Sequence, residues 1–195
     1  MCVPTEVATR ERELTMNCNA IAKPDPCFSL ASGWGSGSVD FPYLVTPADA
    51  ISAAFNQRNV KVTNFLTNKI SSSALANQDL CLVFVNADSG EGYLAHDGVS
   101  GDRPDLHLQK DGDNLVKTVA QSCGGGSSKT VVIVHSVGAV VVEDWIGLSG
   151  VKGLLFAHLP GQESGNSLVC LNSSFLNNFL TSLGRCALRR RHSKR

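Results

Sequence analysis

Aromatic and charged side chains are both scarce in this sequence. Aromatic residues make up 6% of the 195 residues and charged residues 17%, with 17 Lys and Arg against 17 Asp and Glu. The absence of a basic excess argues against a general nucleic-acid binder, and 43% hydrophobic content argues against a charge-driven disordered chain. No apolar run approaches the roughly 20 residues of a membrane span. The 18 glycines then favour one α/β domain over a helical bundle.

The N-terminus lacks the apolar segment of a signal peptide. Charged residues occupy positions 10–13, where that segment would lie. Taken as it stands, the sequence predicts a soluble chain without a secretion signal of its own.

The seven cysteines lack the spacing of a metal site. There is no C-x-x-C pair, and no histidine lies at a ligand-like interval from a cysteine. Cys81 lies inside an apolar run and is predicted to be a buried free thiol. Cys18 and Cys27 enclose a short proline-containing loop and could form a disulfide in an oxidising compartment. Because the count is odd, at least one thiol stays unpaired, and cysteine usage leaves the compartment open.

Apolar patterning predicts an open, mostly parallel sheet with helices on both faces. The runs at 80–85 and 130–135 are continuous, which is typical of strands buried on both sides. Thr46, followed by a proline and an early acidic residue, marks a helix start. Strands are predicted over 60–63, 80–85, 130–135 and 151–159, and helices from 46, over 113–120 and from 162. The order strand, helix, strand, crossover, strand indicates the α/β class.

Three short motifs resemble known sites but fail in their context. The run 124–130 ends like a phosphate loop, yet Ser128 stands where glycine is required and a strand follows the run instead of preceding it. The run 33–37 has no leading strand for a dinucleotide site. Ser136 follows a buried strand as a hydrolase nucleophile would, but Val134 stands where that turn needs glycine. A serine hydrolase built on Ser136 is therefore the weakest alternative.

The segment 86–93, NADSGEGY, differs because it begins where a buried strand ends. Open parallel sheets bind ligands at that edge. The segment places Asp88 and Glu91 on a glycine-containing loop, with Tyr93 two residues beyond Glu91. Such a carboxylate can act as a general acid if its neighbours raise its pKa, and an aromatic ring offers a platform for a sugar. From spacing alone, a solvated loop whose acids cap the next helix remains the favoured interpretation.

Several motifs in one collinear order favour the general-acid interpretation over the solvated loop. They are GWGSGSVDFPYLVTP (33–47), LVFVNADSGEGY (82–93), GDR (101–103), VIVHSVG (132–138), EDW (143–145) and LPGQESGNS (159–167). Across about residues 28–168 they closely resemble fungal β-glucosidases of glycoside hydrolase family 3.

The resemblance implies half of a two-domain retaining glucosidase that releases terminal β-linked glucose from cellobiose or aryl glucosides. In that family a barrel supplies the Asp nucleophile and an αβα sandwich with a mostly parallel sheet supplies the acid/base Glu. This chain resembles the sandwich. The acid/base then falls on Glu91, and the tyrosine lining the leaving-group side falls on Tyr93. The family also implies secretion and no metal or cofactor, so structural roles are expected for His96 and His158, and a loop-anchoring role for Glu163.

Departures from the family limit what the chain is expected to do alone. It has no Ser-Asp-Trp nucleophile motif, and Asp144-Trp145 follows Glu143 instead. We therefore expect an inactive chain that needs a family 3 barrel as partner, and no nucleic acid or membrane. Beyond Ser167 the family would continue through a helix into a further strand, so the sheet is expected to be incomplete at its C-terminal end. The alternative function is a non-catalytic sandwich that binds a carbohydrate or a partner.

Three regions are predicted: a lead-in segment (1–27), the sandwich (28–171) and an unrelated basic tail (172–195). Residues 185–195 hold six of the 17 basic residues and no acid, so the body of the chain is acidic. Asn172 opens a glycosylation sequon that has meaning only in a secreted chain. The tail is interpreted as a sequence accident, because nothing in the sandwich requires it.

Overall fold

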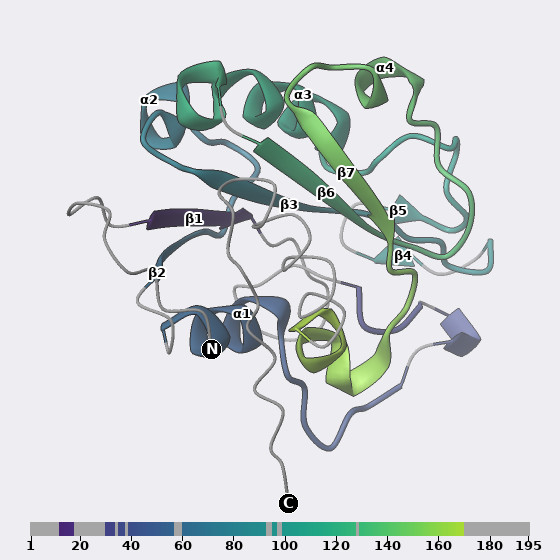
Figure 1. Cartoon of the computed structure of the whole chain (residues 1–195). Helices are drawn as coiled ribbons and strands as arrows, with labels where there is room; N and C mark the ends of the chain where they lie inside the picture. Colours follow the sequence, from purple (N-terminus) through teal and green to yellow (C-terminus); the bar gives the residue numbers. More distant parts are fainter. Residues whose placement is uncertain are drawn as a thin grey trace, which may run out of the picture.

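A parallel sheet of five strands forms the centre of the computed structural model. The model describes residues 12–17, 30–33, 35–37, 39–56, 60–92, 95–96, 99–127 and 129–169. The strands are β1 (Arg12–Asn17), β2 (Val60–Phe65), β3 (Leu80–Ala87), β6 (Lys129–Ser136) and β7 (Val151–Phe156). They lie in the order β2-β1-β3-β6-β7, and every neighbouring pair is parallel. All carboxyl ends therefore lie at one edge of the sheet, on the right-hand side of Figure 1.

Helices cover both faces of this sheet. One face carries α1 (Pro47–Asn56) and a helical segment at 164–169, and the other carries α2 (Ser72–Leu75), α3 (Gly112–Ser122) and α4 (Glu143–Ile146) (Figure 1). Short elements complete the fold: η1 (Gly35–Gly37), β4 (Ala95–His96), β5 (Val99–Ser100), η2 (Cys123–Gly126) and η3 (Gly161–Glu163). The predicted αβα sandwich with a parallel sheet is confirmed. The expected incompleteness of the sheet stays a prediction, because residues 170–195 lie outside the described part of the chain.

Two hydrophobic cores explain why the central strands are apolar without interruption. Alternate residues of a strand face opposite sides. Leu82 and Phe84 pack with Ile51 and the other buried residues of the α1 face. Val83 packs on the other side, in the core formed with Leu115, Val116 and Val119 of α3. All eight residues of β3 are buried, as expected for a strand covered on both faces.

The helix start predicted at Thr46 is confirmed in its local chemistry. The Asp49 amide donates to Thr46 Oγ1 at 3.2 Å, and the Thr46 hydroxyl donates to Asp49 Oδ2 at 2.6 Å. The first bond is that of an N-cap residue to the third helical position, and the second holds the two side chains together. Pro47 occupies the first helical position, where its missing N–H costs nothing.

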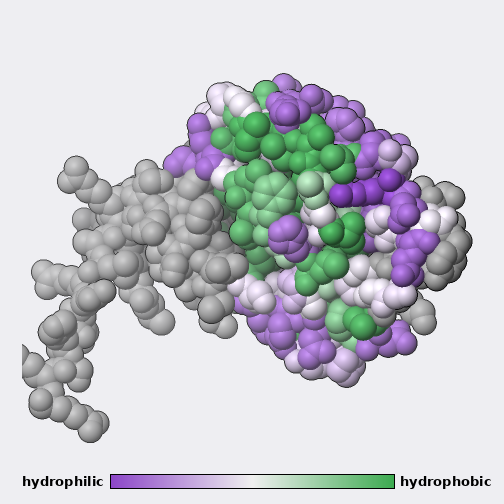
Figure 2. All heavy atoms as spheres, turned by 90° about the vertical axis from the view of Figure 1, so that its right-hand side faces the viewer, coloured by the Kyte–Doolittle hydropathy of each residue, from purple (hydrophilic) through white to green (hydrophobic). Residues whose placement is uncertain are grey.

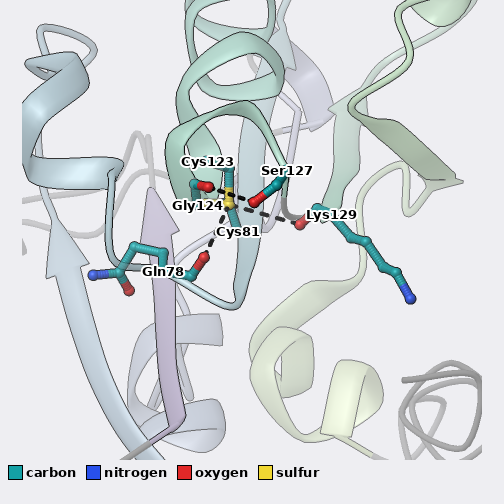
Figure 3. Close-up of a disulfide and its surroundings, with 6 residues drawn as sticks. All are labelled: Gln78, Cys81, Cys123, Gly124, Ser127 and Lys129. Atoms are coloured by element: carbon teal, nitrogen blue, oxygen red, sulfur yellow. Dashed lines mark hydrogen bonds between the residues drawn. A yellow bond between two sulfur atoms is a disulfide. The ribbon is translucent and has the colours of Figure 1, made fainter. Parts of the chain in front are cut away.

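A disulfide between Cys81 and Cys123 corrects the prediction of a buried free thiol. The two Cα atoms are 6.3 Å apart, and both residues are fully buried. Figure 3 shows the bond between the start of β3 and the end of α3, with Cys123 Sγ 3.8 Å from the Lys129 carbonyl oxygen. Sequence spacing did not indicate it, because the two cysteines are 42 positions apart and meet only when α3 packs onto the sheet. Cys18 and Cys27 lie outside the described residues.

β1 is the one strand of the central sheet that the sequence does not predict, and the two-residue strands β4 and β5 were not predicted either. Its six residues run between β2 and β3, with Leu14 opposite both Val62 and Leu80. The segment RELTMN is mostly polar, so it lacks the apolar run that marks β3 and β6. The other predicted strands are confirmed, although β7 ends at Phe156 and not at 159. Among the described residues, no helix has the length and apolarity that crossing a bilayer requires.

Candidate active site

The loop that follows β3 presents Glu91 at the carboxyl edge of the sheet. The side chain of Glu91 is exposed, and its backbone is left-handed, with φ at 58°. Gly92 follows with φ at 73°. A Cβ on Gly101 would lie 2.7 Å from the Gly92 carbonyl oxygen, so only glycine permits this close approach. The loop is thus a tight turn with a carboxylate at its tip.

Ser36 holds the Glu91 carboxylate. The Ser36 amide donates to Glu91 Oε2 at 2.8 Å, and the Ser36 hydroxyl donates to the same oxygen at 2.9 Å. Ser36 belongs to the glycine-rich segment 33–37, which lies 55 residues away in sequence. Sequence reasoning used that segment for the resemblance and gave its serine no role. The signal was its place in a glycine-rich turn, where backbone N–H groups are available to a carboxylate.

Asp88 lies in a different environment from Glu91, although both are on the same loop. Its side chain is 4% exposed, and its Oδ1 accepts the Ser89 amide at 2.8 Å. The contact holds the Asp88 carboxylate against its own main chain. Of the two acids predicted on this loop, the structure therefore presents only Glu91 to solvent.

The segment Gly101 to Arg103 fastens the far side of the loop. The Gly90 amide donates to the Gly101 carbonyl oxygen at 2.9 Å. The Ser89 hydroxyl donates to Asp102 Oδ1 at 3.0 Å and accepts the Arg103 amide at 3.2 Å. The Arg103 guanidinium then donates through Nη1 to the Ala139 carbonyl oxygen at 2.7 Å. The GDR motif thus connects the Glu91 loop to the loop after β6.

Ser136 and His135 do not form a nucleophile and base. Successive residues of a strand face opposite sides, so the two side chains diverge. Ser136 is 1% exposed, and its hydroxyl donates to the Gly138 carbonyl oxygen at 2.7 Å. His135 is fully buried, neither ring nitrogen has a hydrogen-bond partner, and burial lowers its pKa to about 4. The serine-hydrolase alternative has no geometric support.

The Asp144-Trp145 pair on α4 is structural. Trp145 is fully buried and donates through Nε1 to Asp113 Oδ1 at 2.7 Å. Lys117 Nζ lies 2.9 Å from Asp144 Oδ2, and this hydrogen bond and charge lower the pKa of Asp144. The pair therefore ties α4 to α3 and is no substitute for a nucleophile motif.

Residues 18–171 match the model of the "Glycosyl hydrolase family 3 C-terminal domain". The chain belongs to this family. The family 3 match covers most of the chain and contains every described residue of the site, including Ser36 and Glu91.

Relatives and solved structures agree with this assignment. The chain is 57% identical over 141 residues to "Probable beta-glucosidase E" of Aspergillus fumigatus, a match that covers 72% of this chain and 14% of the relative. It is 49% identical over 144 residues to "Probable beta-glucosidase A" of Aspergillus flavus, covering 72% of this chain and 16% of that protein. The chain thus spans about one seventh of the length of the curated relatives it matches.

Among solved structures, the β-D-glucoside glucohydrolase of Trichoderma reesei superposes with a TM-score of 0.73 at 36% identity, covering 83% of this chain and 24% of that one. A family 3 β-glucosidase of Neurospora crassa gives a TM-score of 0.72 at 32% identity, covering 85% of this chain and 21% of that one. These neighbours share the sandwich fold of the family 3 domain.

Glu163 of the family 3 domain joins two loops at the carboxyl edge. It accepts the Tyr43 hydroxyl and, at 2.5 Å, the Asn166 side-chain amide. The Tyr43 bond lowers the pKa of Glu163 and raises the pKa of Tyr43. These contacts suit the loop-anchoring role expected for Glu163.

The edge of the family 3 domain that carries Glu91 also carries exposed apolar side chains. Figure 2 views the molecule from the side where the strands end, and hydrophobic atoms form a patch on it. Val137, Phe156 and Leu159, which lie just beyond or at the ends of β6 and β7, are 37%, 40% and 39% exposed. A Cβ on Gly33 would be 3.4 Å from Leu159 and 3.8 Å from Val137, so the patch reaches the glycine-rich segment. We call these three side chains the edge patch.

Other predicted site residues of the family 3 domain are not described. Tyr93 and Asn172 lie outside the described residues, and only the backbone of His96 is placed, in β4. His158 is exposed beyond β7 with a left-handed backbone, φ 48°. Within the described part of the chain, no three His, Cys, Asp or Glu side chains are grouped to hold a metal ion.

Proposed function

We propose that this chain is the acid/base-bearing domain of a retaining β-glucosidase, with Glu91 as the acid/base. The observation that carries the proposal is the placement of Glu91. It stands exposed at the tip of the loop after β3, at the ligand-binding edge of the sheet, with Ser36 bound to one carboxylate oxygen.

Hydrolysis of a glycoside requires a carboxyl group that can reach the glycosidic oxygen. In a retaining mechanism one carboxyl protonates the leaving oxygen while a second attacks the sugar carbon, and the first then acts as base for the water that releases the sugar. The two Ser36 donors leave the other carboxyl oxygen of Glu91 for the proton and set the direction of the group before substrate arrives, which is the positioning that the first role requires. Tyr93, two residues further on, is proposed to line the leaving-group side.

The second carboxylate is proposed to come from a barrel domain of family 3 that docks against the carboxyl edge. In retaining enzymes the two carboxyl groups lie roughly 5–5.5 Å apart, so the partner must approach Glu91 closely. The edge patch supports such a contact, because neighbouring exposed apolar side chains mark interaction surfaces. The chain alone is therefore expected to be inactive.

Secretion is part of the same proposal. The buried Cys81–Cys123 disulfide is the kind of bond that persists in oxidising compartments. We propose that the protein acts outside the cell on β-glucosides or cello-oligosaccharides, with Asn172 as a glycosylation site.

The test joins this chain to a family 3 barrel and measures nitrophenol release from nitrophenyl β-glucoside. We expect no turnover by the chain alone and turnover by the assembled protein. Glu91→Gln should lower kcat/KM by about 10²–10⁴-fold, the usual contribution of a general acid/base. Glu143→Gln, which alters an exposed glutamate on α4, is the matched control and should keep full activity.

The leaving group makes the test specific for the acid role. A dinitrophenyl glucoside needs little protonation, so Glu91→Gln should slow its glycosylation step far less than that of an alkyl glucoside. Full activity of Glu91→Gln on the alkyl glucoside would refute the assignment. Sugar binding without turnover in the assembled protein would favour the non-catalytic binding module.

A further inference from the structure

Gln109 contacts the Glu91 loop at the residue where the sheet stops. The ladder between β3 and β6 ends with Ala87 opposite Ser136, and Asp88 is the first residue beyond it. The Asp88 amide donates to Gln109 Oε1 at 2.9 Å, and Gln109 Nε2 donates to the Asp88 carbonyl oxygen at 2.7 Å. One side chain therefore satisfies both backbone polar groups of Asp88.

The Gln109 side chain takes the place of a neighbouring strand. A carboxamide carries the same donor and acceptor as a peptide group, and a strand residue exchanges just such a pair with its neighbour. The Gln109 main chain adds a third bond, its amide donating to the Asn86 carbonyl oxygen at 2.9 Å. Gln109 thus bonds the backbone on both sides of Ala87, at Asn86 inside the ladder with β6 and at Asp88 just beyond it.

Gln109 is itself held in place by its neighbours. Leu108 is 6% exposed in the α3-side core, and its amide donates to Asp113 Oδ2 at 3.1 Å. Lys110 and Asp111 then adopt left-handed backbone conformations, with φ at 53° and 64°. The Asn68 side chain donates to the Lys110 carbonyl oxygen at 2.6 Å. A backbone that costs free energy and is held by such contacts aims the Gln109 side chain in one direction.

We propose that Gln109 is a positioning residue for Glu91. It fixes the direction in which the chain leaves β3, and the turn of Ser89 and Gly90 then carries Glu91 to Ser36. The segment Gly101 to Arg103 fastens the far side of this turn, and Gln109 fastens its beginning. The catalytic meaning of this arrangement rests on the proposed function, whereas the positioning itself is a property of this chain.

Two substitutions at one position separate hydrogen bonding from packing. Gln109→Met keeps the size of the side chain and removes both hydrogen-bonding groups. Gln109→Glu keeps the acceptor for the Asp88 amide but, when ionised, cannot donate to the Asp88 carbonyl oxygen. When protonated, the introduced carboxyl again offers one donor and one acceptor, so acid should restore the arrangement in this variant alone.

The first measurement is amide hydrogen exchange at Asp88 and Gly90 in the whole chain, compared with the unsubstituted protein at the same pH. At about pH 7.5 both variants should exchange at least tenfold faster at these amides, with unchanged protection in β6. Near pH 3.5, below the reference carboxyl pKa of roughly 4.3, Gln109→Glu should recover most of its protection relative to the unsubstituted chain at that pH. Gln109→Met should not recover, and Gln121→Glu on the exposed side of α3 should resemble the unsubstituted chain throughout.

The second measurement follows Glu91 through its partner. The Ser36 amide donates to the Glu91 carboxylate, so its proton chemical shift should titrate with Glu91 in the unsubstituted chain. The amplitude of this titration should fall by more than half in Gln109→Met. The proposal would be overturned if both variants kept the loop protection and the Ser36 titration amplitude of the unsubstituted chain. If Gln109→Met does not fold, the pH recovery of Gln109→Glu decides, because its absence refutes the hydrogen-bonding role.

Activity supplies a separate result. In an assembled enzyme, Gln109→Met should lower kcat about tenfold or more and leave KM nearly unchanged, because the acid is misplaced and the sugar pocket is not. Altered loop exchange in an assembled protein that never turns over substrate would refute the proposed function and leave the positioning role intact. Unaltered loop exchange of Gln109→Met in an active enzyme would refute the positioning role and leave the proposed function intact.

Discussion

The two ends of β3 differ in burial and in how they are held. At its start, Cys81 is fully buried and covalently joined to Cys123 at the end of α3. At its finish, the chain passes into an exposed turn that carries Glu91, held by hydrogen bonds from Ser36 and Gln109. One end of the strand provides stability, and the other presents a polar group to solvent.

The left-handed backbone positions sharpen this contrast. Near the amino edge they fall on Gly124, Gly125 and Gly126, where they cost little. At the carboxyl edge they fall on Gly92, Gly101 and Gly161 but also on residues with side chains, among them Glu91 and His158. Non-glycine residues in this conformation concentrate at functional sites, because the surrounding structure must hold them there. Among the described residues, left-handed positions with side chains are thus found at the edge that carries Glu91.

Removing the disulfide should have the largest effect on stability. Replacing Cys81 and Cys123 together by Ser frees a loop with a sequence separation of 42. The chain-entropy model then gives a loss of about 4 kcal/mol in the free energy of unfolding. Urea unfolding measures it, and a reducing agent should destabilise the unsubstituted chain but not the double variant. A loss below about 1 kcal/mol would mean that the amino edge does not depend on the bond.

Acid should destabilise the protein through His135. Burial lowers the pKa of His135 from 6.5 to about 4, so the unfolded state binds more protons and stability falls as the pH drops from 6.5 towards 4. Between pH 7 and pH 5 the expected loss from this residue is about 2 kcal/mol. His135→Leu should remove this part of the pH dependence in urea unfolding, whereas His158→Leu, at an exposed histidine, should not. An unchanged slope in His135→Leu would contradict the prediction.

A pair of glycine substitutions gives the smallest effect and the most direct test of the backbone contrast. A Cβ on Gly125 or on Gly147 would meet no atom within 4 Å, but only Gly125 has a positive φ, 66°. Gly125→Ala should therefore cost about 1–2 kcal/mol from backbone strain alone. Gly147→Ala, at φ −82°, should be neutral or slightly stabilising. If both substitutions changed the stability equally in thermal unfolding, the left-handed backbone at Gly125 would not be what requires glycine there.

The sequence predicts those parts of the fold that local chemistry determines. β3 and β6 are continuous apolar runs, and Thr46 with Pro47 and Asp49 specifies its own helix start. The sequence does not predict β1 because RELTMN, with only Leu14 and Met16 apolar, lacks a continuous apolar run and is a strand only between β2 and β3. Its position depends on partners far along the chain, which a reading of neighbouring residues does not contain.

The candidate site divides in the same way. Motif order placed Glu91 at the end of a strand, and the structure puts it on an exposed turn there. Its contacts with Ser36 and the support from Gln109 were not predicted, because they join segments that are distant in sequence. A glutamine before a helix is unremarkable until the fold brings it beside Asp88.

The Cys81–Cys123 bond also makes part of the chain a closed covalent ring. The ring contains the Glu91 loop, Gln109 and all of α3, together with an exposed stretch at 104–107. Such stretches are where proteases cut. A single cut there opens the ring without releasing either piece, so the Glu91 loop and α3 remain one molecule. For a protein exposed to proteases, this means that damage to the main chain need not end its assembly.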